Sequence, residues 1–286
     1  MQNAFTVDVE DYFQVTSFEK EVPREKWDNY EPRVVESTQR ILRLLEKHQV
    51  QGTFFILGWV AERFPELVKQ IHSGGHEIGS HSYWHRLIYT QTPDEFREDL
   101  IKSRDILQNI ISEPVTVYRA PSFSITNKSL WALDILAEEG FRVDSSIFPT
   151  RHDRYGMHNC DPAIHTLETA AGNLEEFPMT VLQKAGLNIP VGGGGYFRLY
   201  PLWFTMYALN QINRKHNRPC MFYIHPWEVD PDQPRIPTKS RKSRFRHYIN
   251  LGSTEKKLDK MLSKMNFGAM RDFMSKEITK PNLELV

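Results

Sequence analysis

Two histidines stand four residues apart in the segment His81-Ser82-Tyr83-Trp84-His85. On one turn of a helix, side chains at this spacing lie on the same face and both reach a single metal ion. The chain has eleven histidines, and surface or helix-capping histidines produce the same spacing. The pair alone is therefore weak evidence for a metal site and needs support from another part of the chain.

The N-terminal segment Asp8-Val9-Glu10-Asp11 supplies three carboxylates within four residues. It continues the apolar run 5–9, which predicts a buried first strand, where charged groups are costly unless they are paired or bound to metal. The alternative is a strand that has ended and leaves its acids in solvent. Two imidazoles and a carboxylate, with open positions for water, form a known hydrolytic ligand set. The two segments together predict a hydrolytic metal site.

Two further polar residues come directly after predicted strands. Arg119 follows the run 115–118 and precedes a proline that stiffens the turn, and His225 follows the apolar run 220–224. Taken singly, such an arginine is more often a surface salt-bridge partner, and such a histidine is more often structural. What the candidates share is their position at the carboxyl end of a strand.

A regular alternation of elements positions these residues. Apolar runs rich in β-branched and aromatic residues alternate with amphipathic segments, which is typical of a βα-repeating fold with a parallel sheet. The predicted strands are 5–9, 53–57, 76–80, 115–118, 141–144 and 220–224. The predicted helices are 33–48, 65–73, 92–111, 127–139 and 201–216, the third of them opened by a capping box from Thr92 to Glu95.

The alternation weakens beyond about residue 150, and neither a repeat nor a clear linker divides the chain. We therefore expect a single domain over residues 1–286, with βα repeats over about 1–150 and a decorated C-terminal half over about 151–286. The basic run 239–246 in that half is interpreted as a solvated loop. Contact of this run with a membrane or with an anionic lipid-linked carrier is the alternative.

The overall composition narrows the partners. The 36 basic residues balance the 36 acidic ones, so no net field attracts nucleic acid, and a neutral glycan fits better than a polyanion. Two cysteines, Cys160 and Cys220, indicate free thiols in a reducing compartment. The start of the sequence has no signal-peptide pattern, and no apolar run is long enough to cross a bilayer. These features predict a cytoplasmic protein without a transmembrane segment, and they leave the oligomeric state open.

The order of the motifs resembles the NodB-homology polysaccharide deacetylases of carbohydrate esterase family 4, over nearly the whole chain. Within that family the chain is similar to the subgroup encoded beside exosortase-type exopolysaccharide loci. The marks of that subgroup here are the segments 7–13 (VDVEDYF), 193–198 (GGGYFR), 225–228 (HPWE) and 232–235 (DQPR). The resemblance implies an α/β fold of the irregular (β/α)7 barrel type.

Carried over by position, the resemblance makes Asp8 the general base and His81 and His85 metal ligands. Family members usually have two adjacent aspartates, base then ligand, whereas here a valine separates Asp8 from Glu10 and Asp11. Residues two apart in an extended strand face the same side, which favours Glu10 as the third ligand. If the strand has already turned at that point, Asp11 takes the position instead.

The resemblance also implies the groups that act on the substrate. His225 would be the catalytic acid, oriented by Asp144, while Arg119 would tune the base. The backbone N–H of Ser122 would belong to the oxyanion site. A serine stands at this position where the family usually has an aromatic residue, which leaves the substrate wall there in question.

The activity implied is metal-dependent hydrolysis of the N-acetyl group of an N-acetylated sugar, oligosaccharide or lipid-linked glycan, in exopolysaccharide biosynthesis. The cofactor would be one divalent ion, with zinc first and cobalt, nickel or manganese as alternatives. Tyr196 and Trp227 are candidates for stacking on sugar rings, with buried core positions as the alternative. Two rival functions stay open: hydrolysis of a non-peptide C–N bond in a small molecule, and non-catalytic glycan binding on a degenerate deacetylase fold.

Overall fold

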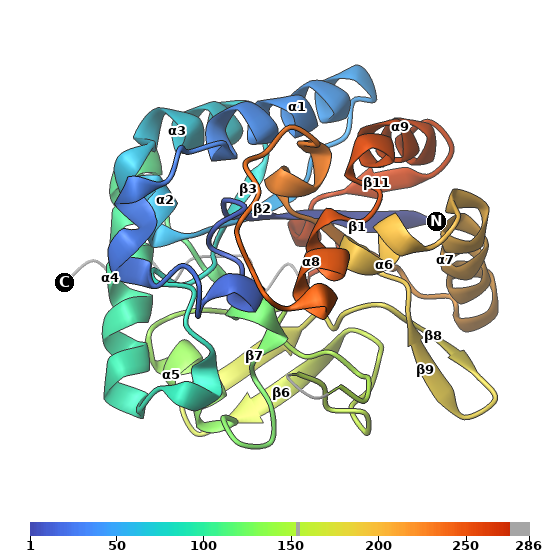
Figure 1. Cartoon of the computed structure of the whole chain (residues 1–286). Helices are drawn as coiled ribbons and strands as arrows, with labels where there is room; N and C mark the ends of the chain where they lie inside the picture. Colours follow the sequence, from blue (N-terminus) through green and yellow to red (C-terminus); the bar gives the residue numbers. More distant parts are fainter. Residues whose placement is uncertain (153–154, 275–286) are drawn as a thin grey trace.

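The fold is built on one curved, mostly parallel sheet (Figure 1). The computed structural model describes residues 1–152 and 155–274. Within them the main sheet has the order β10-β1-β2-β3-β4-β5-β7-β6, with β11 paired to β1. Its strands are β1 (Gln2–Val9), β2 (Thr53–Ile56), β3 (Glu77–Ser80), β4 (Val117–Tyr118), β5 (Val143–Asp144), β6 (His165–Thr169), β7 (Gly172–Glu176), β10 (Met221–Ile224) and β11 (Asn266–Gly268).

Strand β1 is the centre of this sheet. It pairs in parallel with β2, β10 and β11, and every residue from Asn3 to Val9 is buried. Parallel strands that are covered on both faces are usually apolar along their whole length. Asp8, the one carboxylate within β1, is therefore an exception that calls for a partner.

The sheet curves into an incomplete barrel. Strands β6 and β7 pair antiparallel, while β8 (Val181–Lys184) and β9 (Leu187–Pro190) form a separate hairpin. No pairing within the described residues joins β10 to β6 at the opposite edge. Arg119, which follows β4, nevertheless reaches Thr6 of β1 and Met221 of β10 across the interior. The inside of the curved sheet is thus filled by side chains.

The helices fall into two groups in Figure 1. Those of the N-terminal half lie along the top and left: α1 (Val34–Lys47), α2 (Gly58–Arg63), α3 (Pro65–Ser73), α4 (Pro93–Ile111) and α5 (Trp131–Glu138). Those of the C-terminal half are α6 (Gly194–Leu199), α7 (Leu202–His216) and α9 (Leu251–Leu262), which lie on the right, and α8 (Arg241–Tyr248), which lies in front near the centre of the view. No helix in the described part of the chain is both long and apolar enough to span a bilayer.

The α/β fold class predicted from the sequence is confirmed, and each predicted strand and helix has a counterpart within a few residues. The capping box is present, since Thr92 accepts from the N–H of Glu95 and the Glu95 carboxylate accepts from the N–H of Thr92. The interpretation of 239–246 as a solvated loop is wrong from Arg241 onward, where α8 begins after the N-cap Ser240. Its sequence has no apolar stripe, so tertiary contacts rather than periodicity produce this helix.

The glycine run before α6 is held directly against β10. Gly193 forms a parallel bridge with Tyr223 and has φ of 133°, a conformation that L side chains rarely adopt. A Cβ atom at this position would lie 1.9 Å from the carbonyl oxygen of Tyr223. Gly252, in the first turn of α9, has nothing within 4 Å of the same added atom.

We expect Gly193→Ala to lower the free energy of unfolding by about 3 kcal/mol or more, because it adds backbone strain to a clash with backbone that cannot move aside. The matched control Gly252→Ala should leave the free energy of unfolding unchanged or raise it by up to about 1 kcal/mol. Urea unfolding followed by circular dichroism measures both. Equal stability of the two variants would contradict the close approach at Gly193.

Candidate active site

Four candidate side chains meet at the carboxyl edge of the sheet. Asp8 lies near the end of β1, and His81, Arg119 and His225 directly follow β3, β4 and β10. Parallel strands bring their carboxyl ends to one edge, which is where open α/β sheets bind ligands. A cavity of about 430 Å³ opens there, and its lining includes Asp8, Glu10, His81, His85 and His225.

Arg119 fixes the orientation of Asp8. Its Nη1 atom donates to Asp8 Oδ1 at 2.6 Å and to Thr6 Oγ1 at 2.8 Å, and its guanidinium lies 4.1 Å from the centre of the Phe55 ring. Both charged groups are almost fully buried, so solvent screens their attraction little and loss of either partner would be costly. The second oxygen of Asp8, Oδ2, lies 3.9 Å from His225 Nε2.

Glu10, His81 and His85 form a group suited to one metal ion. Each offers a ligand atom, and these atoms lie within 4.8 Å of one another. The Nδ1 atom of His81 lies 2.8 Å from the carbonyl oxygen of Arg119. Because a carbonyl oxygen only accepts, Nδ1 carries the hydrogen and Nε2 keeps its lone pair for a metal.

The protonation states of this group fit metal binding. Burial lowers the pKa of His81 to about 4, so its imidazole is neutral at pH 7. Burial alone would raise the pKa of Glu10, but the charge and hydrogen bond of His85, together with the charges of His225 and His81, outweigh that effect and lower the pKa to about 2. Glu10 Oε2 lies 2.8 Å from His85 Nε2, the two atoms that would turn to a shared ion, and His85 Nδ1 is buried without a hydrogen-bond partner among the described residues. Two imidazoles and one carboxylate are the donor set of hydrolytic zinc sites, so the residues present fit such an ion.

The two histidines do not lie on a helix, and the prediction of a helical turn is wrong. Residues 81–85 form a loop after β3, with left-handed backbone at Ser82 (φ 65°) and His85 (φ 51°). Asp99 of α4 holds this loop, because its carboxylate accepts from the N–H groups of Tyr83, at 2.8 Å, and of the next residue. Loop geometry, and not the helical period, aims both imidazoles at one point.

Asp11 lies away from the histidines. Its Oδ2 atom accepts from the N–H groups of Arg33 at 2.7 Å and Val34 at 2.9 Å, at the start of α1. A carboxylate there satisfies N–H groups that have no partner within the helix. Burial raises the pKa of Asp11 to about 7, although these hydrogen bonds oppose the shift. Of the two acids that the sequence offered as third ligand, the structure places Glu10 beside His85 and Asp11 at a helix cap.

His225 is oriented by Glu228. The Oε1 atom of Glu228 lies 2.7 Å from His225 Nδ1 and accepts from the His225 backbone N–H at 3.1 Å. Its other oxygen accepts from Arg198 Nε at 2.5 Å. Burial alone would lower the pKa of His225, but the hydrogen bond to Glu228 and the charges of Glu10 and Asp8 raise it to about 9. His225 is therefore protonated at neutral pH, and its Nε2 atom lies 3.6 Å from Glu10 Oε1 and 3.9 Å from Asp8 Oδ2.

Asp144 does not orient His225, contrary to the prediction from the family resemblance. Its carboxylate accepts from Ser146 Oγ at 2.5 Å and lies against Glu176, and both acids are fully buried. Burial raises the pKa of both groups, and for Glu176 the charge of Asp144 adds to the shift. The pair is best described as two carboxyl groups sharing protons within the core, since like charges this close cannot both ionise.

Glu228 lies in the segment 225–228, one of the marks of the family resemblance, but the sequence alone did not indicate its role. A glutamate three residues after the residue that caps a short helix is the spacing of a capping box, and the structure has this arrangement at Pro226–Val229. That spacing is the signal that would have identified the partner of His225. Arg198, the buried counter-charge of Glu228, lies in the segment 193–198, and no feature of the sequence indicated its role.

Trp227 and Tyr196, the predicted sugar platforms, have different surroundings. The Trp227 ring stacks on the rings of His225 and His247, with centroids 5.1 Å and 4.2 Å away, and the residue is 6% exposed. Its Nε1 atom donates to Glu10 Oε1 at 3.1 Å. The indole is therefore a support for Glu10 and takes the buried position that the sequence left open as the alternative, although it still belongs to the cavity lining. Tyr196 is half-buried and lines the cavity.

The cavity wall is aromatic, although Ser122 is not. Phe123, which the sequence analysis did not name, has φ of 53° and packs edge-on against Tyr223, with ring centroids 5.0 Å apart, and against Tyr155. Ser122 also has left-handed backbone, and its Oγ atom lies 2.8 Å from Thr16 Oγ1. The aromatic side chain expected at position 122 is thus supplied by the next residue.

Two family models match successive parts of the chain. Residues 27–142 match the polysaccharide deacetylase model, and residues 145–275 match a domain of unknown function, DUF3473. The first segment contains His81, His85 and Arg119, the second contains His225 and Glu228, and the N-terminal acids precede both. The site is therefore assembled from three stretches of sequence.

Similar proteins of known activity match short stretches. A peptidoglycan-N-acetylglucosamine deacetylase of Bacillus cereus is 39% identical over 101 residues, which are 35% of this chain and 37% of the relative. The peptidoglycan-N-acetylmuramic acid deacetylase PdaA of Bacillus subtilis is 33% identical over 84 residues, 29% of this chain and 32% of the relative. The aligned stretches thus span about a third of the length of these relatives.

Solved structures resemble the fold over most of the chain. A structure from Mycobacterium smegmatis, assigned to the polysaccharide deacetylases, matches with a TM-score of 0.61 at 19% identity and covers 94% of this chain and 87% of the other. Puue allantoinase matches with a TM-score of 0.59 at 14% identity, with the same coverage. Identities this low show a shared fold, and the activity has to be argued from the site itself.

The different positions of Glu10 and Asp11 lead to a test of which acid is the third metal ligand. Glu10→Gln should weaken zinc binding by more than the roughly ten- to hundredfold typical of losing an outer partner, because it removes a ligand charge. Asp11→Asn should keep zinc affinity and lower only the free energy of unfolding, because Asp11 caps α1. Zinc titration with a competing chromophoric chelator measures the affinities. Equal loss of affinity in both variants would contradict the separation of roles.

Proposed function

The chain contains a polysaccharide deacetylase domain, and from that premise we propose that it removes the N-acetyl group from an N-acetylated sugar or glycan in a metal-dependent reaction. The observation that carries the proposal is the arrangement around one cavity. Glu10, His81 and His85 converge on a point that fits a metal ion, and Asp8 and His225 stand beside them. A base, an acid and a metal site are the parts that amide hydrolysis requires.

Glu10, His81 and His85 would hold one divalent ion, for which zinc is our first candidate. Such an ion polarises a carbonyl and makes water acidic enough to be deprotonated near neutral pH. Trp227 would keep Glu10 in place from behind, and the Arg119 carbonyl would fix His81. The protein thus supplies the ligands and also the groups that orient them.

Asp8 would act as the general base. Arg119 occupies Oδ1, which leaves Oδ2 directed toward the cavity side, where His225 Nε2 lies 3.9 Å away. As water attacks the acetamide carbonyl carbon, Asp8 takes its proton. The N–H of Ser122, at the cavity wall, is our candidate donor to the oxyanion that forms.

His225 would act as the general acid. Glu228 holds Nδ1 and favours the charged imidazolium, so that Nε2 carries a proton into the cavity. When the C–N bond breaks, that proton passes to the departing nitrogen, and the products are acetate and a free amino sugar. Tyr196 and Phe123 would form part of the wall against which the sugar lies.

Three broader parts of the proposal concern the domain organisation, the biological context and the compartment. We propose that residues 1–286 form a single domain, because strands β10 and β11 of the second matched segment pair with β1. Exopolysaccharide biosynthesis is the proposed context, on the resemblance to the exosortase-associated subgroup. A reducing compartment is proposed because Cys160 and Cys220 are both free.

Acetate release from the zinc-loaded protein tests the activity. The substrates are N-acetylated nucleotide sugars, lipid-linked sugars and short oligosaccharides, assayed side by side. Asp8→Asn should lower turnover by about 10²–10⁴-fold, the usual contribution of a general base, while zinc affinity stays that of the parent. A zinc-loaded parent that releases no acetate from any of these, or an Asp8→Asn variant with parental turnover, would contradict the proposal.

The partner of His225 gives a separate test. Glu228→Gln removes a negative charge from Nδ1, which lowers the pKa of His225. Because the acid must be protonated, the alkaline limb of kcat/KM should move to lower pH, and kcat should fall more than KM changes. The matched variant Asp144→Asn should leave this limb in place, since Asp144 does not contact His225. The opposite result, a shift only in Asp144→Asn, would restore the role that the family resemblance implied.

A further inference from the structure

The charges of the chain are balanced overall but unevenly placed. Of the 36 acidic residues, none lies in the segments 177–227 or 233–254, whereas the same segments hold five and six of the basic residues. These segments contain α6 and α7, which lie on the right in Figure 1, and α8, which lies in front and is joined to α6 by Arg198. The surface they form is therefore strongly cationic, although the net charge of the protein is zero.

The cations at α8 are free to meet a partner. Lys239, Arg241, Lys242, Arg244 and Arg246 are all exposed. None of them forms a salt bridge with a carboxylate in the part of the chain that the structure describes. Five like charges on a short stretch repel one another, so an anionic partner would relieve this repulsion.

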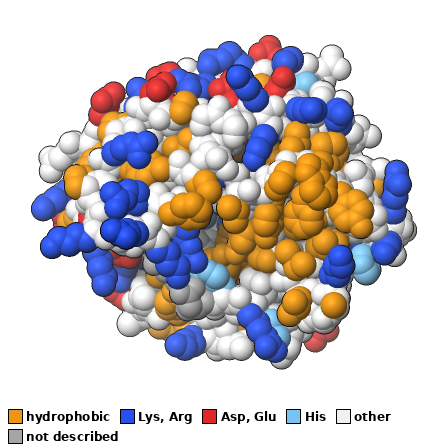
Figure 2. Space-filling model, turned by 45° about the vertical axis from the view of Figure 1, so that its right-hand side comes forward, with side chains coloured by type: hydrophobic (Ala, Val, Ile, Leu, Met, Phe, Trp, Pro, Cys, Tyr) orange, Lys and Arg blue, Asp and Glu red, His pale blue; other side chains and the backbone are white. Residues whose placement is uncertain are grey.

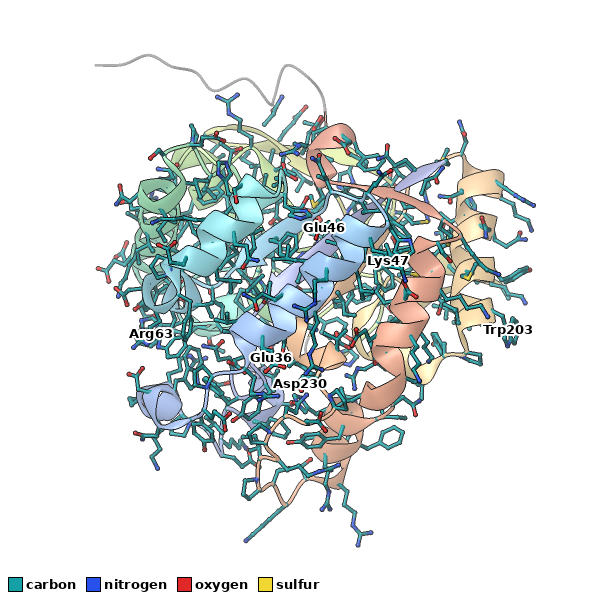
Figure 3. The ribbon with its side chains drawn as sticks, turned by 90° about the horizontal axis from the view of Figure 1, so that it is seen from above. Glu36, Glu46, Lys47, Arg63, Trp203 and Asp230 are labelled. Carbon is teal, nitrogen blue, oxygen red and sulfur yellow. The ribbon has the colours of Figure 1, made fainter. Side chains whose placement is uncertain are left out.

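Large apolar side chains are exposed on the same helices, α6, α7 and α8. Leu199, Trp203, Tyr207 and Phe245 are 48%, 70%, 50% and 58% exposed, and they are four of the seven large apolar side chains exposed in the described residues. Figure 2 shows hydrophobic side chains gathered on one face with lysines and arginines around them. In Figure 3, Trp203 points away from α7 into solvent. We call these four residues, together with Lys239 and the four cations of α8, the mouth surface.

The mouth surface borders the cavity. Leu199, Lys242, Phe245 and Arg246 belong to the cavity lining. Arg198 joins α6 to the end of α8, because its guanidinium donates to three backbone carbonyl oxygens there, including that of Arg246 at 2.9 Å. Whatever binds the mouth surface therefore meets the opening of the candidate active site.

Exposed aromatic side chains beside unpaired cations are the pattern of proteins that bind at a membrane surface. Trp and Tyr favour the boundary between headgroups and acyl chains, and Lys and Arg are attracted to anionic headgroups. A second copy of this chain would place the same cations opposite one another, and a nucleic acid would leave the aliphatic side chains without a partner. We propose that the mouth surface docks the protein on a bilayer containing anionic lipids.

Docking in this orientation turns the cavity opening toward the lipid. If the proposed function holds, the substrate would then be an N-acetylated glycan that is attached to a lipid or held at the membrane surface. This statement about the substrate is the only part that rests on the proposed function. The docking itself depends on charge and exposure alone. Each cation near an anionic leaflet strengthens binding by roughly fivefold, so a few of them with two aromatic anchors suffice for reversible binding.

The test is co-sedimentation of the full chain with vesicles of phosphatidylcholine alone and of phosphatidylcholine mixed with phosphatidylglycerol. We expect binding to the anionic vesicles that weakens as salt is raised. The double variants Trp203→Ser/Tyr207→Ser and Arg241→Glu/Arg244→Glu should each lower the partition coefficient by about tenfold or more. None of these four residues lines the cavity.

The matched control is Lys128→Glu/Leu130→Ser, an exposed cation and an exposed leucine just before α5, on the other side of the ribbon in Figure 1. This control should bind anionic vesicles like the parent. No binding to anionic vesicles, or equal loss in the control, overturns the proposal. A concentration-dependent dimer that Trp203→Ser/Tyr207→Ser disrupts, with no vesicle binding, would assign the mouth surface to a second copy instead.

The same variants separate this proposal from the proposed function. Acetate release from a water-soluble N-acetylated oligosaccharide should be unchanged in the two double variants, because their residues lie outside the cavity lining. Vesicle binding without any acetate release would overturn the deacetylase function and leave the docking surface standing. Acetate release without vesicle binding would overturn the docking proposal and leave the deacetylase function standing.

Discussion

The buried guanidinium of Arg119 is the interaction on which the rest of the site depends. Its side chain holds Asp8 of β1 and reaches Met221 of β10, while its own carbonyl oxygen fixes the imidazole of His81. A charge in this place is tolerated because its donors are matched by a carboxylate and by further acceptors. One residue thus sets the direction of the base and the tautomer of a metal ligand, and it also ties together the strand ends that carry them.

Much of the fold was predictable because its signals are local. The run that forms β1 carries apolar Phe5, Val7 and Val9 at alternate positions, and the capping box at Thr92 marks the start of α4 by side-chain chemistry alone. The period of an extended strand favoured Glu10 over Asp11 without settling the choice, because β1 ends at Val9 and the chain turns there, with the Glu10 N–H donating to the Asp8 carbonyl oxygen at 3.0 Å. The helix α8 was not predictable, since its residues have no apolar periodicity and its position depends on contacts with α6.

The partner of His225 shows where inference from family position fails. Asp144 stands where the resemblance expects an orienting carboxylate, but in this chain it shares protons with Glu176 in the core. Glu228, three residues after His225, forms the hydrogen bond to its Nδ1 atom within a local turn. The imidazole thus has a negative neighbour, but that neighbour is Glu228 and not Asp144. Sequence position alone does not distinguish the two.

Placing the orienting carboxylate on Glu228 has a structural consequence. Glu228 is buried and needs a counter-charge, which Arg198 supplies at 2.5 Å. The same guanidinium donates to carbonyl oxygens at the end of α8, where a cation also meets the negative end of the helix dipole. The orientation of His225 and the position of α8 therefore share one side chain. If α8 docks on a lipid surface as proposed, the surface that binds and the acid that donates are joined through Arg198, and neither can be repositioned without disturbing the other.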